Sequence, residues 1–291
     1  MRPRSVGTAA RVRRASHLGV AVWLLAIAFG GAGCPRATGG GGDTKRSTTR
    51  LDLAKDYLAR GQLEASEGEA RKAVEFDGDN VEAYNVLGLV EYLRAVRNFN
   101  LLEVEDCLTG VDAEALRQQI DEHLGLADKQ FARAVDIDAE YGEAWANRGL
   151  VAFHLEDYAA SARYLEKALT YPQRLVNIGL ARAHLGWAYF HEKNMPRAAT
   201  ELRQAEQFNR GMCVAKYRLG RVYFARKEWN KALEQFQAID ADRSCPMQEA
   251  QLYLLETYRA LGTRDPLAGT QKRCIEMAPK SCVAARCRAL L

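Results

Sequence analysis

Residues 179–212, GLARAHLGWAYFHEKNMPRAATELRQAEQFNRGM, are one clear copy of a repeated sequence pattern. The next 34 residues, 213–246, align with it without a gap. Leucine–glycine pairs recur at 185–186 and 219–220, and aromatic and alanine residues follow them at matching distances. A fixed period of this length is typical of stacked helix-turn-helix units, in which each unit buries its apolar face against its neighbours.

The period extends over residues 47–281 and has the pattern of a tetratricopeptide repeat. In this pattern, small residues stand where the two helices of a unit approach closely, and large residues fill the gaps between units. Residues 47–80, 142–175 and 248–281 supply further copies. The sequence therefore predicts an all-α fold, a right-handed α-solenoid of about six tetratricopeptide repeats, with a C-terminal capping helix at 282–291.

One copy of the repeat is longer than the others. Residues 81–141 contain 27 residues more than the 34-residue pattern. The extra stretch lies at about 96–119 and includes Thr109-Gly110-Val111-Asp112, a sequence suited to a turn and a helix start. We expect this insertion to enlarge the loop within its unit and to lengthen the second helix.

The N-terminal residues do not follow the repeat. Residues 1–33 combine five arginines, an apolar run at 17–29 and a run of small residues, which is the layout of a secretory signal peptide. Cys34 follows directly, so we expect a lipoprotein with its lipid (palmitate) on Cys34, although Gly31 stands where such signals usually have Leu. The alternatives are an ordinary cleaved signal or an uncleaved anchor. Residues 34–46 are rich in Gly and Thr and predict a flexible tether.

The charge balance argues against a nucleic-acid partner. Removal of residues 1–33 leaves 36 Lys and Arg against 37 Asp and Glu, a formal charge of −1. The sequence pI of 8.6 therefore reflects the arginines of the signal peptide. No basic surface for DNA or RNA is predicted.

The first helix of each repeat unit is expected to face the inner side of the solenoid. Places two, five, nine, twelve and thirteen of a unit project there, and in this chain they are mostly apolar or aromatic. Such a surface usually marks a partner-binding site, although some of these side chains also pack against the next unit. The predicted groove residues are Leu89, Tyr92, Leu93, Leu150, Phe153, Trp187, Phe190, Tyr217, Arg221 and Phe224.

No catalytic pattern is evident in the sequence. His191-Glu192 lacks the second histidine of a zinc-protease motif, and Gly39–Gly42 follows no strand. His154 and His191 occupy the thirteenth place of adjacent units and could bind a metal or respond to pH, but solvated side chains are the expected alternative. We expect that the protein is not an enzyme and that it has no cofactor, metal site or small-molecule substrate.

Six cysteines follow Cys34, and an exported protein can form disulfides. Cys274 and Cys287 should lie on antiparallel neighbouring helices, and Cys245 and Cys282 lie at unit boundaries about one repeat apart. These two bridges are predicted, with buried free thiols as the alternative.

Several tracts resemble the type IV pilus pilotins, outer-membrane lipoproteins with six such repeats. The tracts are Tyr171-Pro172-Gln173-Arg174, Leu185-Gly186-Trp187-Ala188-Tyr189 and Phe208-Asn209-Arg210, and the likeness covers about residues 45–281. The insertion and the cysteine-rich C-terminus depart from that pattern. The resemblance implies a scaffold, lipid-anchored at the periplasmic face of the outer membrane, that helps the pilus secretin subunit to localise and assemble. The alternative is another envelope adaptor lipoprotein, acting on peptidoglycan or outer-membrane assembly.

Overall fold

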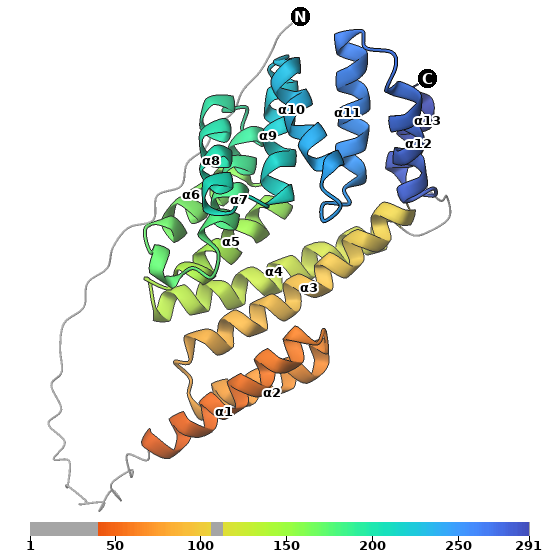
Figure 1. Ribbon diagram of the computed structural model, residues 1–291. Helices are drawn as coiled ribbons and strands as arrows, with labels where there is room; N and C mark the ends of the chain where they lie inside the picture. Colours follow the sequence, from red (N-terminus) through yellow and green to blue (C-terminus); the bar gives the residue numbers. More distant parts are fainter. Residues whose placement is uncertain (1–39, 106–112, 291) are drawn as a thin grey trace, which may run out of the picture. The chain divides into compact units, whose positions relative to one another are not determined.

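The computed structural model describes residues 40–105 and 113–290, which form thirteen α-helices and one short 3-10 helix and contain no β-strand. Each helix packs against the next along the chain (Figure 1). The prediction of an α-solenoid is confirmed. The helices are α1 Gly40–Ala59, α2 Leu63–Phe76, α3 Val81–Glu105, α4 Ala113–Ile137, α5 Gly142–His154, α6 Tyr158–Leu169, η1 Pro172–Arg174, α7 Ile178–His191, α8 Met195–Phe208, α9 Cys213–Ala225, α10 Trp229–Ala241, α11 Gln248–Leu261, α12 Leu267–Met277 and α13 Cys282–Ala289.

Close approach of the two helices explains the small residues of the repeat. A Cβ atom added at Gly186 in α7 would lie 2.7 Å from the Cγ of Leu202 and 3.0 Å from the carbonyl oxygen of Ala198, both in α8. At Gly220 in α9 it would lie 2.6 Å from the ring of Phe236 in α10. These separations are shorter than van der Waals contact, so only glycine fits.

A residue in the left-handed region ends the first helix of five units. Gly61 and Gly262 have φ of 71° and 70°, and Glu156, Lys193 and Lys227 have φ of 60°, 65° and 60° at the equivalent place. The backbone reverses there and starts the second helix. Three of the five positions therefore hold a residue that costs free energy in this conformation.

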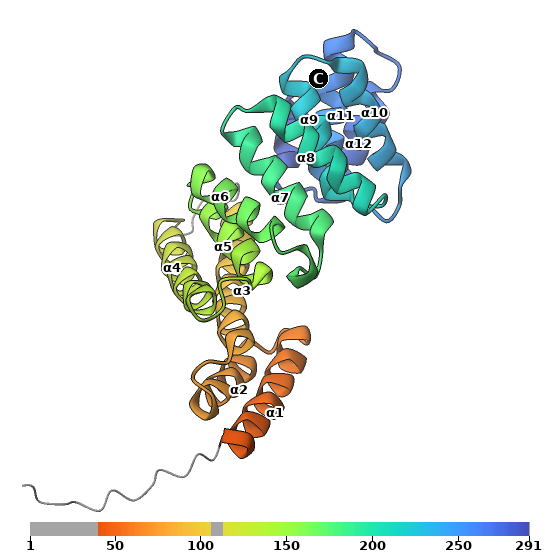
Figure 2. The same cartoon turned by 90° about the vertical axis from the view of Figure 1, so that its left-hand side faces the viewer.

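The long unit lacks that turn. Its equivalent residue, Ala95, is buried within α3, so the first helix continues for more than two further turns. Helices α3 and α4 each contain 25 residues and lie side by side (Figures 1 and 2). The insertion thus lengthens both helices, the second as expected from the sequence and the first in addition. The predicted turn at 109–112 lies outside the described residues.

Helix α1 begins within the predicted tether. Its helical segment starts at Gly40, against the weak helix propensity of glycine. Contacts with α2 hold this helix from Arg46 onward: the hydroxyl of Ser47 donates to the carbonyl of Ala73 at 2.8 Å, and the Arg46 guanidinium lies 5.8 Å from the ring centroid of Phe76. The predicted signal peptide, Cys34 and the first part of the tether lie outside the described residues.

One predicted disulfide is absent from the structure. Cys245 is bonded to Cys213, with their Cα atoms 5.6 Å apart, so it cannot pair with Cys282. Cys213 begins α9 and Cys245 follows α10, and these two ends of one unit meet because its helices fold back on each other. The predicted pairing joined boundaries of neighbouring units, whereas the observed bridge joins the two ends of a single unit.

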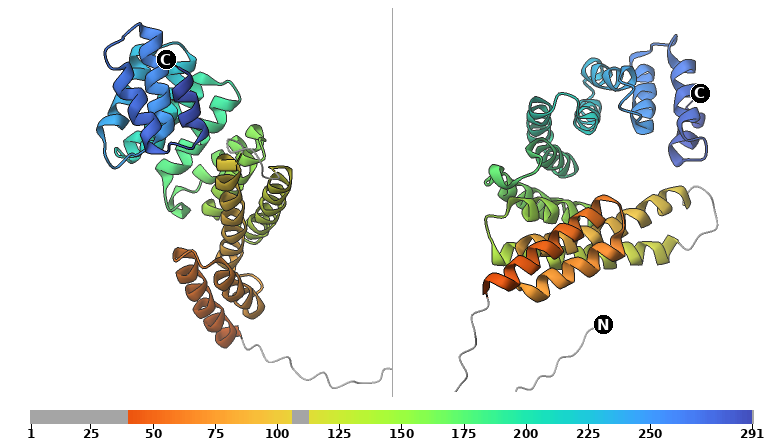
Figure 3. Two further views of the ribbon diagram at one scale, coloured as in Figure 1. Left: turned by 90° about the vertical axis from the view of Figure 1, so that its right-hand side faces the viewer. Right: turned by 60° about the horizontal axis from the view of Figure 1, so that its bottom comes forward.

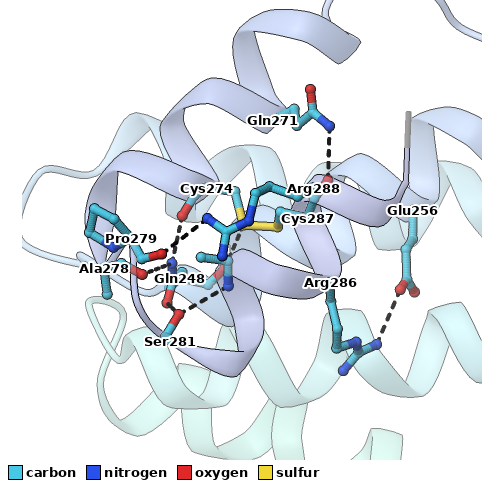
Figure 4. The surroundings of a disulfide bond; sticks show 11 residues. Gln248, Glu256, Gln271, Cys274, Ala278, Pro279, Ser281, Arg286, Cys287 and Arg288 are labelled. Carbon is cyan, nitrogen blue, oxygen red and sulfur yellow. Dashed lines mark hydrogen bonds and ion pairs between the residues drawn. A yellow bond between two sulfur atoms is a disulfide. The ribbon is translucent and has the colours of Figure 1, made fainter. Parts of the chain in front are cut away.

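The C-terminal helix closes the last unit. Cys274 of α12 and Cys287 of α13 form a disulfide with their Cα atoms 6.4 Å apart, the pair that the register predicts (Figure 4). The amide of Gln248 in α11 donates to the Cys274 carbonyl at 2.6 Å, and the hydroxyl of Ser281 lies 2.7 Å from the Gln248 side-chain oxygen (Figure 4). Helices α12 and α13 lie side by side at this end of the array (Figures 1 and 3).

No helix in the described ranges has both the length and the apolar composition needed to cross a lipid bilayer.

Candidate functional site

The first helices of successive units contact one another, in the order α3, α5, α7, α9 and α11. Their predicted groove residues are packed rather than freely exposed. Phe190 is buried, with 9% of its surface exposed. The other nine are partly buried: Leu89, Tyr92, Leu93, Leu150, Phe153, Trp187, Tyr217, Arg221 and Phe224.

Aromatic and histidine rings form a row across these five helices. Ring centroids are 5.7 Å apart between Tyr92 and His154, and 5.2 Å apart between Phe153 and His191. The row continues from His191 to Trp187 at 4.9 Å, and then to Tyr217 on α9 at 6.4 Å. We call this surface the aromatic face; its members are Tyr92, Phe99, Phe153, His154, Trp187, Phe190, His191, Tyr217, Phe224 and Tyr253.

Two arginines of α9 lie against the aromatic face. The Nη1 of Arg221 donates to the hydroxyl of Tyr217 at 2.8 Å, and its guanidinium lies 3.9 Å from the ring centroid of Tyr253. Arg218 reaches the Nδ1 of His184 at 3.3 Å and lies 5.6 Å from the Trp187 ring. In the described part of the chain, neither guanidinium has a carboxylate within ion-pair distance.

The environment of Arg218 is unfavourable to its charge. Burial lowers the pKa of this guanidinium to about 10, because it loses hydration without gaining an anionic partner. Burial also lowers the pKa of His154 to about 4, and the positive charge of Arg218 adds to that effect. The pKa of His184 is lowered by the same two causes, so these histidines are neutral near neutral pH.

His154 and His191 are not the solvated side chains that the sequence suggested. The Nε2 of His154 lies 3.1 Å from the hydroxyl of Tyr92. His191 packs between Phe153 and Tyr158, and its buried Nε2 has no hydrogen-bond partner in the described structure. Burial is the main cause that lowers the pKa of His191. The described residues contain no group of three or more His, Cys, Asp or Glu side chains that could hold a metal ion.

A pocket of about 280 Å³ opens between α5, α7 and the segment joining α6 to α7. Leu150, Leu165 and Leu180 line it together with His184, the residue that Arg218 contacts. Val176 at its rim is 88% exposed. His184 therefore links the lining of this pocket to Arg218 of the neighbouring helix α9.

The sequence argument missed Arg218, His184 and Tyr253. All three occupy the sixth place of a unit, which was not among the places assigned to the inner side. Places two, six, nine and thirteen form one stripe on a helix, because residues three or four apart share a face. Counting back three residues from the ninth place, from Trp187 to His184 and from Arg221 to Arg218, would have identified the sixth place as part of this face.

The repeat geometry, with its small residues between paired helices, defines the class: a tetratricopeptide-repeat α-solenoid. Solved structures of this class superpose on the chain. PilF of Pseudomonas aeruginosa has a TM-score of 0.64 at 17% identity, over 85% of this chain and 99% of that chain. PilW, a widely conserved type IV pilus biogenesis factor, has 0.64 at 18%, over 82% and 96%. YrrB, a repeat protein with an unusual peptide-binding site, has 0.51 at 18%, over 76% and 97%.

These similarities establish the fold. No protein-family model matches the chain, and no curated protein matches it by sequence.

Proposed function

We propose that the chain is a pilotin-like lipoprotein that assists assembly of a type IV pilus secretin at the outer membrane. The observation that supports this most is the extent of the structural likeness: the PilF chain is covered over 99% of its length, and PilW over 96%. PilW is described as a type IV pilus biogenesis factor. Of the tracts that resemble pilotins, residues 171–174 directly precede Leu175 and Val176 of the pocket, and residues 185–189 contribute Trp187 to the aromatic face.

In this proposal the chain acts by binding and catalyses no reaction. The lipid on Cys34 keeps the protein at the periplasmic face of the outer membrane. The aromatic face holds a segment of the secretin subunit and shields its apolar side chains until the ring assembles. Aromatic residues and arginine are the side chains most enriched among residues that dominate binding energy, which fits this surface.

Crosslinking in the native cell tests the proposal. The tagged full chain is crosslinked and its partners are identified, in parallel for the wild type, Trp187→Ala and Phe208→Ala. Phe208 lies on α8 and is 57% exposed, so it serves as an aromatic control away from the aromatic face. We expect the secretin to co-purify with the wild type and Phe208→Ala but not with Trp187→Ala, and Cys34→Ser to release the protein from the membrane.

Recovery of peptidoglycan enzymes or outer-membrane assembly factors without secretin would contradict the pilotin role and favour the adaptor alternative. Circular dichroism of each variant separates loss of binding from loss of folding. Intact pili after deletion of the protein would contradict the proposal directly.

A further inference from the structure

The two arginines of the aromatic face have no anionic partner within the described chain. A buried charge without a counter-ion destabilises a fold. Each guanidinium carries five N–H donors. Among the polar groups of the described residues, Arg218 contacts the Nδ1 of His184 and Arg221 contacts the Tyr217 hydroxyl. Most of their N–H donors therefore have no acceptor among the described residues.

A buried nitrogen without a hydrogen-bond partner lies on the neighbouring helix α7. The Nε2 of His191 is buried without a hydrogen-bond partner, and Arg218 and Arg221 both act on the charge of this ring. Three side chains from two neighbouring helices, α7 and α9, thus offer hydrogen-bond donors or positive charge in one aromatic environment. A carboxylate can accept from a planar guanidinium through both of its oxygens, which makes it the group best matched to this set.

The apolar surroundings indicate what carries the carboxylate. Apolar and aromatic side chains lie on both sides of the arginines, from Phe153 on α5 to Tyr253 on α11. The pocket beside His184, with Val176 and Leu180 at its rim, is suited to an aliphatic side chain. Because the apolar surface continues in both directions, the carboxylate belongs to a side chain within a longer segment and not to a chain end.

We infer that the aromatic face binds a peptide segment of the partner protein in which a Glu or Asp side chain pairs with Arg218 and Arg221 and a nearby aliphatic residue enters the pocket beside His184. The inference rests on the proposed function and specifies the chemistry of the segment that the face takes. Residues 1–39 of this chain contain no acidic residue, so its own N-terminal segment does not fit.

Selection from a random 12-residue peptide library on the full chain tests the inference. We expect the selected peptides to share an acidic residue flanked by Leu, Ile or Phe. For a synthetic peptide of that consensus, replacing its Glu by Gln should weaken binding roughly 30-fold. The Arg218→Met variant should lose a similar factor, and Glu→Gln should have no further effect on that variant.

Matched variants separate charge from fold. Arg218→Lys keeps the charge but loses the planar fork, so binding should fall between wild type and Arg218→Met. Arg226→Met removes an arginine from the end of the same helix, where it pairs with Glu228, and should leave affinity unchanged. Amidation of the peptide's C-terminus should also change nothing; a loss on amidation would overturn the assignment to an internal side chain.

The outcomes distinguish the two proposals. If peptides bind and are lost on Trp187→Ala but show no acidic preference, the carboxylate inference fails and the binding face stands. If no peptide is selected, or if Trp187→Ala leaves binding intact, the carboxylate inference fails, and the crosslinking result decides the proposed function separately.

Discussion

Arg94 and Arg218 are two partly buried arginines on the first helices of their units, and they differ in whether a carboxylate pairs with them. Arg94 on α3 binds Glu67 of α2 and Glu91 of its own helix, each at 2.7 Å, and Glu91 also lies 2.8 Å from His123. Burial acts against the charge of Arg94, but the hydrogen bonds to Glu67 and Glu91 raise its pKa above the ordinary value. Burial lowers the pKa of Arg218 because no carboxylate compensates for it in the described structure.

The difference separates charges that hold the fold from charges that are available for recognition. At the junction of α2 and α3, Glu67 pairs with Arg71 and Arg94, and Glu91 pairs with Arg94. In the α7–α9 region, Arg218 and Arg221 have no carboxylate partner in the described structure. An arrangement that lowers the stability of the fold in this way is commonly a sign of function. Substitution of the two arginines should therefore have opposite effects on stability.

The largest effect is expected for Arg94→Met. Loss of this arginine leaves Glu91, whose side chain is 11% exposed, and Glu67 near each other without their shared cation. We expect the free energy of unfolding to fall by about 3 kcal/mol. The equivalent change at Arg218 removes an unpaired charge and replaces it with an apolar side chain of similar length, so stability should stay the same or rise.

Urea unfolding of the wild type, Arg94→Met and Arg218→Met measures this contrast. A loss of stability in Arg218→Met as large as that in Arg94→Met would show that Arg218 has a structural counter-ion, and the distinction between the two regions would then be false.

As the pH falls, the free energy of unfolding should decrease first through His154 of the aromatic face, before the charged junction of α2 and α3 responds. The folded-state pKa of His154 is about 4, below its ordinary value of 6.5, so the unfolded chain binds more protons between these values. The stability that this histidine contributes is therefore complete above about pH 6.5 and is lost as the pH falls toward 4. Between about pH 7 and pH 5 the loss should be about 2 kcal/mol.

The charged junction responds at lower pH. Burial raises the pKa of Glu67, but hydrogen bonds from Arg71 and Arg94 outweigh this and lower it below 4.5. Its contribution is complete above that ordinary value and is lost only as the pH falls below it. Unfolding of wild type and His154→Gln across this range should show a smaller pH slope in the variant above pH 5; equal slopes would contradict the assignment.

Much of this fold was predictable because its determinants are local and periodic. Gly186 and Gly220 recur at a fixed spacing, and the contact each makes with its second helix lies within the same unit. The groove residues followed from the same counting. The sequence-based prediction agreed best with the structure where the contacts lie within one repeat unit, as at 179–212.

The remainder depended on contacts that a repeat pattern does not encode. Helix α1 is held against α2 from Arg46 onward, within the predicted tether, and the Cys213–Cys245 bridge depends on how the ends of one helix pair meet. Arg218 was missed because the pattern assigns faces by place in the unit, whereas its environment is set by His184 and Trp187 on the preceding unit.

The smallest expected effect concerns the turns, where the repeat units also differ from one another. Gly61 makes the left-handed turn of the first unit, and Lys193 makes that of the fourth. Lys193→Gly relieves the steric cost of a side chain at positive φ, about 1–2 kcal/mol, and loses up to about 1 kcal/mol through the greater freedom of the unfolded chain. The net gain should be about 0.5–1 kcal/mol.

Gly61→Ala is the matched control and should lose about 1 kcal/mol, since no atom lies within 4 Å of the added Cβ and only the backbone conformation opposes it. Thermal unfolding of both variants checks the pair. A gain from Lys193→Gly alone would mean that the turn of the first unit tolerates a side chain. A loss from both would mean that Lys193 stabilises its turn through contacts that outweigh the strain.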